Sequence, residues 1–273
     1  MSWEPGAIKG CAEPVWTESG LPQLAVSGSM ELVSALDARS GVVSVVGAGG
    51  KKSTMYRLAE AIDRAVVTAT VRIPPFESHV ARVVVTDDPV RTILDASEDD
   101  WPLGLVPKIE REDRYLGYAT ELIDSMAEIE TVDTILVKAD GARLRKFKAP
   151  DQREPQVPAS STVVVPVVSA HVIGQPLSDE LVHRVDRVAT LTGLSPGQIM
   201  TPEAVAAVLS SSDGGHKGVP DGATVIPLIN MVDDDGLYRR ARQVADSLLS
   251  HRAYRRVILT QLTAEQPVVE VVE

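Results

Sequence analysis

The chain has 273 residues, of which 44% are hydrophobic and 24% are charged, a composition typical of a globular protein with one large α/β domain or two small ones. Its 38 acidic and 27 basic residues give a net charge of −11 at pH 7, which opposes binding to DNA, RNA or anionic lipid. We therefore expect no nucleic-acid partner. The single cysteine, Cys11, excludes an intramolecular disulfide and a cysteine-cluster zinc site, and we expect a cytoplasmic protein.

No segment of the sequence has the features of a membrane span. The most apolar stretch, residues 163–174, is shorter than the roughly 20 residues that a spanning helix needs, and it is interrupted by Pro166, Ser169 and His171. The first residues also lack the basic start and the apolar core of a signal peptide. We expect no membrane partner.

The first elements in chain order are a lead-in, a helix and a strand. Residues 1–25 have scattered glycine, proline and acidic residues without a period, which predicts a loosely packed lead-in. Ser29 is in the position of an N-cap for a helix over residues 30–39, whose apolar side chains share one face. The nearly all-apolar residues 42–46 predict a parallel strand buried on both faces.

A second strand follows after a glycine-rich turn and a helical pattern that extends to Ile62. Residues 65–70 form this strand and complete the strand–loop–helix–strand order of a βαβ unit. Further apolar runs predict strands at residues 82–86, 134–138, 162–168, 224–229 and 257–262. Helical patterns lie between most of them, notably at residues 114–130, 201–210 and 237–250. This alternation predicts an α/β fold with a mostly parallel, doubly wound sheet flanked by helices.

Two segments near the end of the chain differ from this alternation. Residues 148–158 contain three prolines, which predicts an ordered loop or a lid rather than regular structure. Residues 267–273 alternate valine and glutamate, as an edge strand does. We assign residues 26–273 to a single domain, with a helical excursion at about residues 178–210.

The most informative motif is the glycine-rich turn after the first strand, where residues 47–54 read GAGGKKST. A buried strand that ends in such a turn and opens a helix directs several backbone N–H groups at one point. The helix dipole and a lysine add positive charge there, and glycine permits the positive φ that such a loop needs. We therefore expect a P-loop NTPase-like site for ATP or GTP, whose nucleotide-binding residues are Gly47, Ala48, Gly49, Gly50, Lys51, Lys52, Ser53 and Thr54.

The match to the standard G-x-x-x-x-G-K-[ST] pattern is imperfect. Lys51 follows Gly47 by four residues, which gives a shorter G-x-x-G-K loop, and Lys52 stands where a hydroxyl normally holds Mg²⁺. Ser53 or Thr54 would supply that ligand if the loop shifts by one residue, and Lys52 would then be the phosphate lysine. The alternative interpretation is a glycine-rich turn with two solvated lysines.

An aspartate follows the predicted strand at residues 134–138. In open parallel sheets ligands bind beyond the carboxyl ends of the strands, where Asp140 is located. Asp140 and Ser53 are therefore our candidate ligands for Mg²⁺, directly or through water. The alternative is that Asp140 and Gly141 only make a turn.

A cluster of cations follows directly in this otherwise acidic chain. Arg143, Arg145, Lys146 and Lys148 lie within six residues, which indicates a patch for an anionic substrate or for the nucleotide phosphates. A solvated loop whose charge balances nearby acids explains the cluster equally well.

Two further pairs of residues are weaker candidates. Thr68 and Thr70 end the second strand at the same sheet edge, where they would contact phosphate or metal, although threonines in strands often only pack. Asn230 and Asp233 follow a strand with the N-x-x-D spacing by which GTPases bind guanine, but Met231 replaces the usual lysine. We treat this pair as a candidate contact for the nucleotide base.

An ordered series of short motifs connects these regions. The series is GAGGK at residues 47–51, VTAT at 67–70, ADGAR at 139–143, KAP at 148–150, EP at 154–155, VP at 157–158 and HR at 183–184. It resembles the YqeC family, whose members are described as accessory or cofactor-biosynthesis factors for selenium-dependent molybdenum hydroxylases. The resemblance covers about residues 30–233. It implies a P-loop-type fold and a molybdenum hydroxylase, or its cofactor machinery, as partner. With the basic cluster and the family motifs, our candidates for the substrate or phosphate side are Arg143, Lys148, Glu154, His183 and Arg184. A lone histidine such as His183 is more often structural or solvated than catalytic.

Three positions depart from the family pattern. Lys52 replaces the first hydroxyl of the loop, Lys138 replaces the glutamate of E-A-D-G, and Arg153 replaces the histidine of H-E-P. The two lysines would weaken Mg²⁺ binding or replace part of its charge, which argues against hydrolysis. The loss of the histidine removes a candidate proton shuttle.

These observations leave three functional hypotheses open. The first is an accessory protein that couples ATP or GTP to the maturation of a selenium- or molybdenum-dependent hydroxylase, with NTP hydrolysis or phosphoryl transfer as its chemistry. The second is a degenerate module that binds a nucleotide or phosphate without hydrolysing it, which Lys52 and Lys138 favour. The third is a ligase or kinase for small acids, because the short loop resembles that of the Mur ligases. No residue stands out as a general base.

Overall fold

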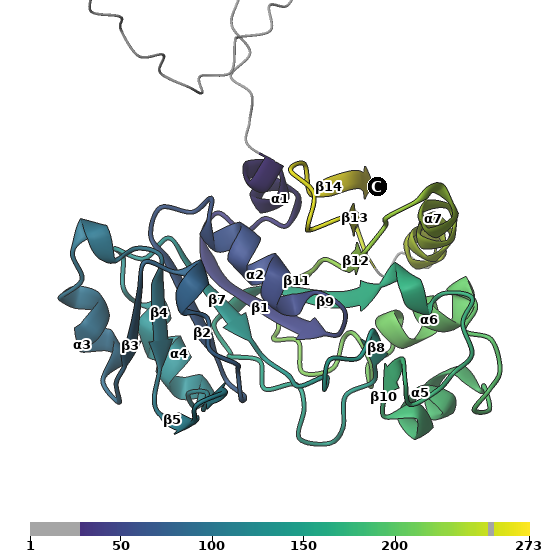
Figure 1. Ribbon diagram of the computed structural model, residues 1–273, viewed down its shortest axis with the longest axis horizontal. Coiled ribbons are helices and arrows are strands. Elements are labelled where there is room, and N and C mark those ends of the chain that lie inside the picture. Colours follow the sequence, from purple (N-terminus) through teal and green to yellow (C-terminus); the bar gives the residue numbers. More distant parts are fainter. Residues whose placement is uncertain (1–27, 251–253) are drawn as a thin grey trace, which may run out of the picture.

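A ten-stranded sheet organises the part of the chain that the structure describes (Figure 1). The computed structural model describes residues 28–250 and 254–273, and the predicted lead-in over residues 1–25 lies outside them. The strands follow one another across the sheet in the order β14 (Val268–Val272), β13 (Val257–Thr260), β12 (Leu228–Asn230), β9 (Ser161–Ser169), β1 (Gly41–Gly47), β7 (Thr134–Lys138), β2 (Ala65–Ala69), β4 (Leu103–Val106) and β3 (Arg82–Val85), with β11 (Thr224–Val225) beside β9. All pairs are parallel except β13 and β14. The predicted α/β class and the mostly parallel sheet are therefore confirmed.

Helices cover both faces of this sheet because successive strand residues point to opposite sides. The helices are α1 (Gly28–Ala35), α2 (Lys51–Ala59), α3 (Pro89–Leu94), α4 (Thr120–Ala127), α5 (Val185–Thr192), α6 (Pro202–Ser210) and α7 (Asp235–Ser250). Val43 and Val45 of β1 belong to the apolar cluster of α1 and α2, whereas Val42 belongs to the cluster of α3 and α4. The βαβ unit predicted around the glycine-rich turn is present as β1, α2 and β2.

A third apolar cluster joins the C-terminal half of the sheet to α5, α6 and α7. Its members include Val168, Ile229 and Leu259 from β9, β12 and β13, together with Phe147. Phe147 belongs to a small parallel pair outside the main sheet, β8 (Phe147–Lys148) with β10 (Val182–His183). This pair connects the end of the basic loop, residues 143–148, to the segment that leads into α5.

Most strands occur where the apolar runs predicted them, and residues 267–273 supply β14, the predicted edge strand. The single strand predicted at residues 224–229 is wrong, because Ile226 and Pro227 separate it into β11 and β12. Pro227 has no N–H to donate within a strand, and its carbonyl accepts a hydrogen bond from Ile258 N instead. The short strand β4, which lies between two prolines in the sequence, was not predicted.

Two helix boundaries also differ from the sequence predictions. The helix predicted over residues 114–130 is wrong in its first part, because residues 109–115 form a hairpin of β5 (Ile109–Arg111) and β6 (Arg114–Tyr115), and only α4 is helical. Tyr115 pairs with the backbone of Ile73, so a tertiary contact overrides the helical pattern. Ser29 lies inside α1 and is not its N-cap, since the helix already includes Gly28.

Among the described residues, no helix combines the length and the apolar character needed to cross a membrane.

Candidate functional site

The glycine loop lies between β1 and α2, against the end of β9. Gly47 has φ +88°, and a Cβ there would lie 2.3 Å from the carbonyl oxygen of Val167. Gly49 has φ +91°, and a Cβ there would lie 2.7 Å from the backbone nitrogen of Ser169. The loop therefore needs glycine both for its left-handed backbone and for its close approach to β9.

The loop presents backbone donors to the space above the sheet. The N–H groups of Gly49 and Gly50 have no acceptor within the described residues, and both glycines line the cleft described below. The first N–H groups of α2, which begins at Lys51, also lack acceptors within the helix. These donors and the positive end of the helix dipole make the loop suitable for an anion.

Asp140 meets this loop from the neighbouring strand β7. Its Oδ2 accepts a hydrogen bond of 2.9 Å from Gly47 N, and its Oδ1 lies 2.9 Å from Lys51 Nζ. Lys51 also donates to the carbonyl oxygen of Gly47, so its ammonium is folded back onto the loop. Only 1% of Asp140 and 6% of Lys51 are exposed, which makes this a buried ion pair.

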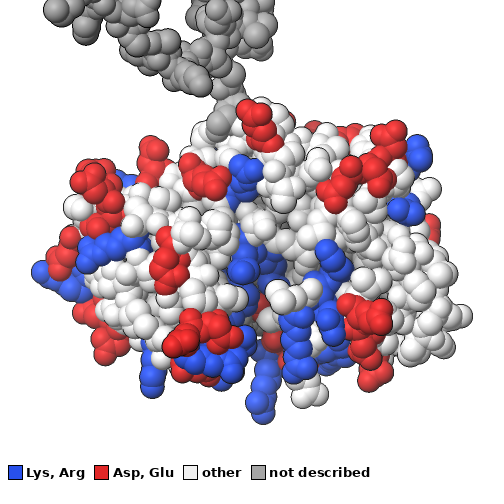
Figure 2. Space-filling model, in the orientation of Figure 1, with Lys and Arg blue, Asp and Glu red and all other residues white. Residues whose placement is uncertain are grey.

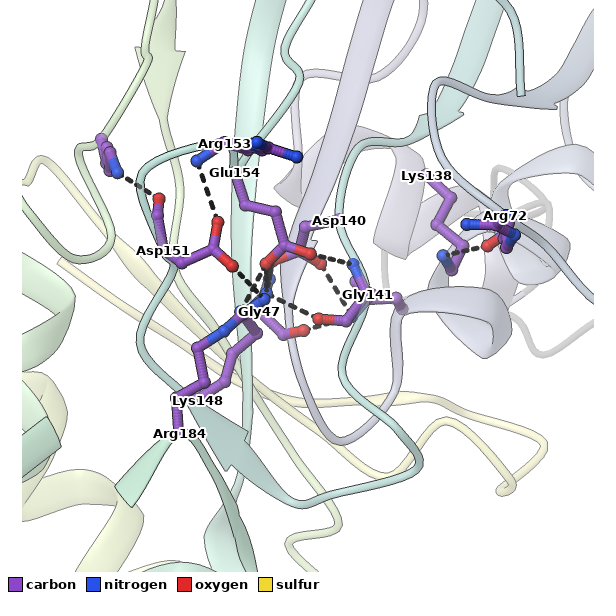
Figure 3. A network of polar contacts seen from close by, with 12 residues as sticks. Gly47, Arg72, Lys138, Asp140, Gly141, Lys148, Asp151, Arg153, Glu154 and Arg184 are labelled. Carbon is purple, nitrogen blue, oxygen red and sulfur yellow. Dashed lines mark hydrogen bonds and ion pairs between the residues drawn. The ribbon is translucent and has the colours of Figure 1, made fainter. Parts of the chain in front are cut away.

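A chain of alternating charges extends from this pair (Figure 3). Lys148 Nζ lies 2.9 Å from Asp140 Oδ2 and 2.5 Å from Glu154 Oε2, and it donates to the carbonyl oxygen of Gly141 at 2.6 Å. Arg184 continues the chain, with 2.6 Å contacts to both Glu154 Oε2 and Asp151 Oδ2. The chain ties α2, the end of β7, the proline-containing segment and the start of α5 into one unit.

The charges in this chain determine the protonation of its acids. Burial by itself would raise the pKa of Asp140, but the ammonium groups of Lys51 and Lys148 hold that pKa below its usual value. Burial opposes the ionisation of Glu154 too, and the hydrogen bond from Arg184 and the charge of Lys148 keep the pKa of Glu154 low. Both carboxyl groups are therefore ionised at neutral pH and already engaged by cations.

Lys138 is the last residue of β7 and, unlike Lys51 and Lys148, it is not paired with Asp140. It is 7% exposed, and its Nζ donates to the carbonyl oxygen of Arg72 at 2.8 Å. Burial, aided by the charge of Lys51, lowers the pKa of Lys138 to about 7. Lys138 forms no ion pair with any carboxylate of residues 28–250 or 254–273.

A cleft of about 850 Å³ opens above the glycine loop and the ends of β7 and β2. Of the 24 residues that line it, nine are cationic and two are acidic, although the whole chain carries a net charge of −11. Figure 2 shows lysine and arginine side chains gathered around the hollow in the middle of this face. The cations that line the cleft are Lys51, Lys52, Arg72, Arg114, Lys138, Arg143, Arg145, Lys146 and Arg153.

The structure brings some of the predicted phosphate-side residues to this cleft. Lys52, exposed Ser53, Thr70 and Arg143 line it, and Thr70 Oγ1 donates to the carbonyl oxygen of Gln156 at 2.6 Å. Glu154 also lines the cleft. The loop residues Gly49, Gly50 and Lys51 complete this wall.

Other predicted residues support the cleft from behind or lie outside it. Thr54 and Thr68 are fully buried and donate to the carbonyl oxygens of Gly50 and Leu105, respectively. His183 lies in β10 outside the lining, and burial, together with the charge of Arg184, lowers the pKa of His183 to about 4. Ala48, Lys148 and Arg184 also do not line it.

The predicted base contacts do not face the cleft together. Asn230 is buried, donates from Nδ2 to the carbonyl oxygen of Gly49 at 2.9 Å, and accepts at Oδ1 from Thr260 Oγ1 and Leu262 N, both at 3.2 Å. Asp233 lies near the surface, where its Oδ2 is 3.0 Å from Nε2 of His171. Asn230 therefore supports the glycine loop, and both its amide nitrogen and its amide oxygen bond to protein groups.

Four of the lining cations are not among the site residues predicted from the sequence. Lys138 and Arg153 are only departures from the family pattern, Arg72 follows β2 by three residues, and the sequence pattern places Arg114 in a helix. For Arg72, the position just beyond the predicted strand at residues 65–70 is the sequence feature that could have indicated a site residue. Arg114 reaches the cleft only because the hairpin folds over β2.

The sheet and the cleft define this protein as an α/β protein whose glycine-rich loop opens a helix at a cation-lined cleft. A sequence model described as YqeC protein matches residues 43–186. The protein named "Uncharacterized protein YqeC" from Escherichia coli (strain K12) is 34% identical over 198 residues, which are 70% of this chain and 76% of that protein. The chain belongs to the YqeC family, as the series of motifs predicted.

Proposed function

We propose that this protein binds ATP or GTP, with the phosphates on the loop of residues 47–54, in a P-loop NTPase-like manner. The observation that carries the proposal is the glycine loop itself. The N–H groups of Gly49 and Gly50, which have no acceptor among residues 28–250 and 254–273, open onto a cleft with nine cations. A triphosphate brings about three to four negative charges, which the loop N–H groups, Lys51, Lys52 and the cations of residues 143–146 offset. The loop donors and Lys51 bind the phosphates, and Lys52 adds a second cation at the first turn of α2.

The carboxylate next to the loop does not fit a Mg²⁺ ion held by the protein. Each oxygen of Asp140 lies 2.9 Å from an ammonium group, that of Lys51 or that of Lys148. Mg²⁺ requires near-octahedral oxygen ligands, and the described residues contain no group of three or more His, Cys, Asp or Glu that could hold a metal. We therefore propose that side-chain cations offset the phosphate charge in place of a metal held by Asp140 and Ser53.

Calorimetric titration of ATP and of GTP, each with Mg²⁺ and with EDTA, tests nucleotide binding. We expect binding in both conditions, with an affinity at least 10-fold weaker for Lys51→Ala, since one charge-assisted contact contributes about 1.5–3 kcal/mol. Lys52→Ala removes a cation that has no carboxylate partner among the described residues, so it is the cleaner test. The matched control is Lys108→Ala, an exposed lysine outside the cleft. Absence of heat with either nucleotide for the wild type would refute the proposal.

A second question is whether the bound nucleotide is hydrolysed. Asp140, Glu154 and Asp151 are all paired with cations in the described structure, so none of these acids is free to accept a proton from water. This observation favours the hypothesis of a module that binds nucleotide without turnover. Single-turnover phosphate release with protein in excess is expected to match the rate in buffer, and Mg²⁺-dependent release abolished by Lys51→Ala would favour the NTPase instead.

We further propose, from membership of the YqeC family, that nucleotide binding serves the maturation of a selenium- or molybdenum-dependent hydroxylase. Family membership supports this role, and the residues of the cleft supply its nucleotide step. Hydroxylase activity is to be measured in a host that lacks this gene and carries either the wild type, Lys52→Ala or Lys108→Ala. We expect restoration by the wild type and by Lys108→Ala only. Full activity in the host without the gene would refute the role.

A further inference from the structure

The cleft has a second group of cations, separate from the glycine loop. In the sheet β7 lies between β1, which leads into the loop, and β2, which leads to Arg72. Lys138 and Arg72 accordingly lie apart from the cluster around Asp140 (Figure 3). The hairpin of β5 and β6 adds Arg114 to the same cleft. We call Arg72, Lys138 and Arg114 the β2 wall.

Lys138 is a buried lysine whose amine has no acidic partner among the described residues. Its ammonium has a backbone carbonyl as acceptor, that of Arg72, and no carboxylate of the described residues lies within ion-pair distance. Burying an ammonium without a counter-charge is costly, so such groups are normally paired. The open side of Lys138 faces the cleft, where an anion would provide the missing charge.

Arg114 also lacks a hydrogen-bond partner for one of its donors. Its Nε is buried and makes no hydrogen bond in the part of the chain that the structure describes. Its nearest carboxylate is that of Asp113, with 3.7 Å between Nη2 and Oδ2. A guanidinium with a buried and unused donor at the edge of a cleft is suited to a carboxylate or phosphate group.

The β2 wall is held in place by contacts of its own. Glu110 accepts hydrogen bonds from Arg72, at 2.6 Å from Nη2 and at 2.8 and 2.9 Å from Nε. The backbones of Ile73 and Tyr115 bond to each other in both directions, at 3.1 and 2.8 Å. These contacts fix the hairpin onto the end of β2, so the cations of this wall are positioned before any ligand arrives.

We propose that Lys138 and Arg114 bind an oxyanion group, phosphate or carboxylate, of a second small molecule that occupies the cleft together with the nucleotide. The inference deepens the proposed function, on which it rests, by assigning a second ligand. The nucleotide phosphates are served by the loop and Lys52, whereas the β2 wall offers donors that the loop does not need. A cleft of about 850 Å³ is near the upper end of the range of about 300–1,000 Å³ for small-molecule sites, which leaves space for two ligands.

Calorimetry on the full chain saturated with a non-hydrolysable ATP analogue tests this proposal, with inorganic phosphate and citrate as probes. We expect one of the two probes to bind, with an affinity at least 10-fold weaker for Lys138→Met and for Arg114→Gln. The affinity of the ATP analogue itself should change less than twofold in both variants. The matched control is Arg111→Gln, an exposed arginine of the same hairpin that does not line the cleft.

Two results would overturn the second site while leaving nucleotide binding intact. One is the absence of binding of both probes to the saturated wild type. The other is a loss of affinity for the ATP analogue in Lys138→Met and Arg114→Gln that is as large as the loss of affinity for the probe. This result would make the β2 wall part of the nucleotide site. Binding of a probe that depends on Lys138 and Arg114, in a protein that binds no nucleotide, would support the wall and refute the proposed function.

Discussion

Asp140 is the residue on which the buried charges of the site depend. It lies between the ammonium groups of Lys51 and Lys148, and it also accepts the N–H of Gly47. Without Asp140, the Lys51 ammonium would be buried without an acid, whereas Lys148 would keep Glu154 as its partner. The carboxylate therefore holds the loop and the basic segment together.

Asp140→Asn is expected to destabilise the protein by about 3–5 kcal/mol, because it leaves the Lys51 ammonium buried without an acid. The free energy of unfolding in urea measures this effect. Asp113→Asn is the control, since Asp113 is 66% exposed and surface ion pairs contribute at most about 1 kcal/mol. Equal stability losses in the two variants would contradict the role of Asp140.

Because of Lys138, the free energy of unfolding is expected to depend on pH in the neutral to alkaline range. Burial lowers the pKa of Lys138 from its usual value of 10.5 to about 7 in the folded protein. The charges of Lys51 and Lys148 add to this shift, and those of Asp140 and Glu154 oppose it. Between these two pKa values the unfolded chain binds the proton that the folded chain has lost, so stability rises with pH across this window.

Lys138→Met should remove this dependence and stabilise the protein by about 1–3 kcal/mol near pH 7, with a smaller gain near pH 10. Urea unfolding between pH 6 and pH 10 measures both effects. Lys108→Met, at an exposed position, should leave the pH profile of the wild type unchanged. A parallel pair of profiles for the wild type and Lys138→Met would show that the amine titrates normally.

The elements that carry the site could be predicted largely from the sequence. The apolar runs of β1, β7 and β9 are long enough to identify buried strands, and a parallel sheet brings their carboxyl ends to one edge. The meeting of the glycine loop with Asp140 follows from that topology. By contrast, β4 has four residues between prolines, and the hairpin of β5 and β6 is rich in charged residues that give no strand pattern.

The sequence motifs group Lys148, Glu154 and Arg184 on one side of the site, but they do not show which of these residues pair. Lys148, Glu154 and Arg184 meet because β8 pairs with β10, and each of these strands has only two residues. Asn230 was interpreted as a base contact from its spacing, yet its amide bonds to the glycine loop. Local patterns identify elements, whereas these contacts depend on how the loops close in three dimensions.

The glycine loop provides a test of its own packing. Gly49→Ala would place a Cβ 2.7 Å from Ser169 N at φ +91°, whereas Gly222→Ala has a similar φ of +85° and no atom within 4 Å of the new Cβ. We expect Gly222→Ala to cost about 1–2 kcal/mol for the left-handed backbone, and Gly49→Ala to cost more and to abolish nucleotide binding. Urea unfolding measures the stability losses, and calorimetry measures nucleotide binding. Equal stability losses in the two variants would show that the loop can move to accommodate the new Cβ at residue 49.

At the scale of the whole molecule, the distribution of charge matters more than its sum. The chain is strongly acidic, yet the cleft concentrates cations at one edge of the sheet. A positive cleft in a negative protein attracts small anions at short range, while the outer field disfavours large polyanions. This distribution supports the proposal that the cleft binds small phosphorylated molecules rather than nucleic acid.

Nucleotide affinity is therefore expected to fall severalfold between 50 and 300 mM NaCl, because salt screens the exposed cations. Replacing both Arg143 and Arg145 by Gln should weaken binding at 50 mM NaCl and reduce the dependence on salt. Arg91→Gln is the control, because Arg91 is 71% exposed, lies outside the cleft and is paired with Asp95. Calorimetry at several salt concentrations makes the comparison, and identical slopes for all three proteins would exclude the two loop arginines from the site.

The side chain of Asn230 has one further consequence. It joins the carbonyl of Gly49 to Thr260 and Leu262, residues separated from the loop by some two hundred positions in the chain. The C-terminal residues thus support a loop near the opposite end of the chain. Substitutions that weaken this C-terminal packing are expected to lower the affinity of the loop for an anion, although the replaced residues do not contact the anion.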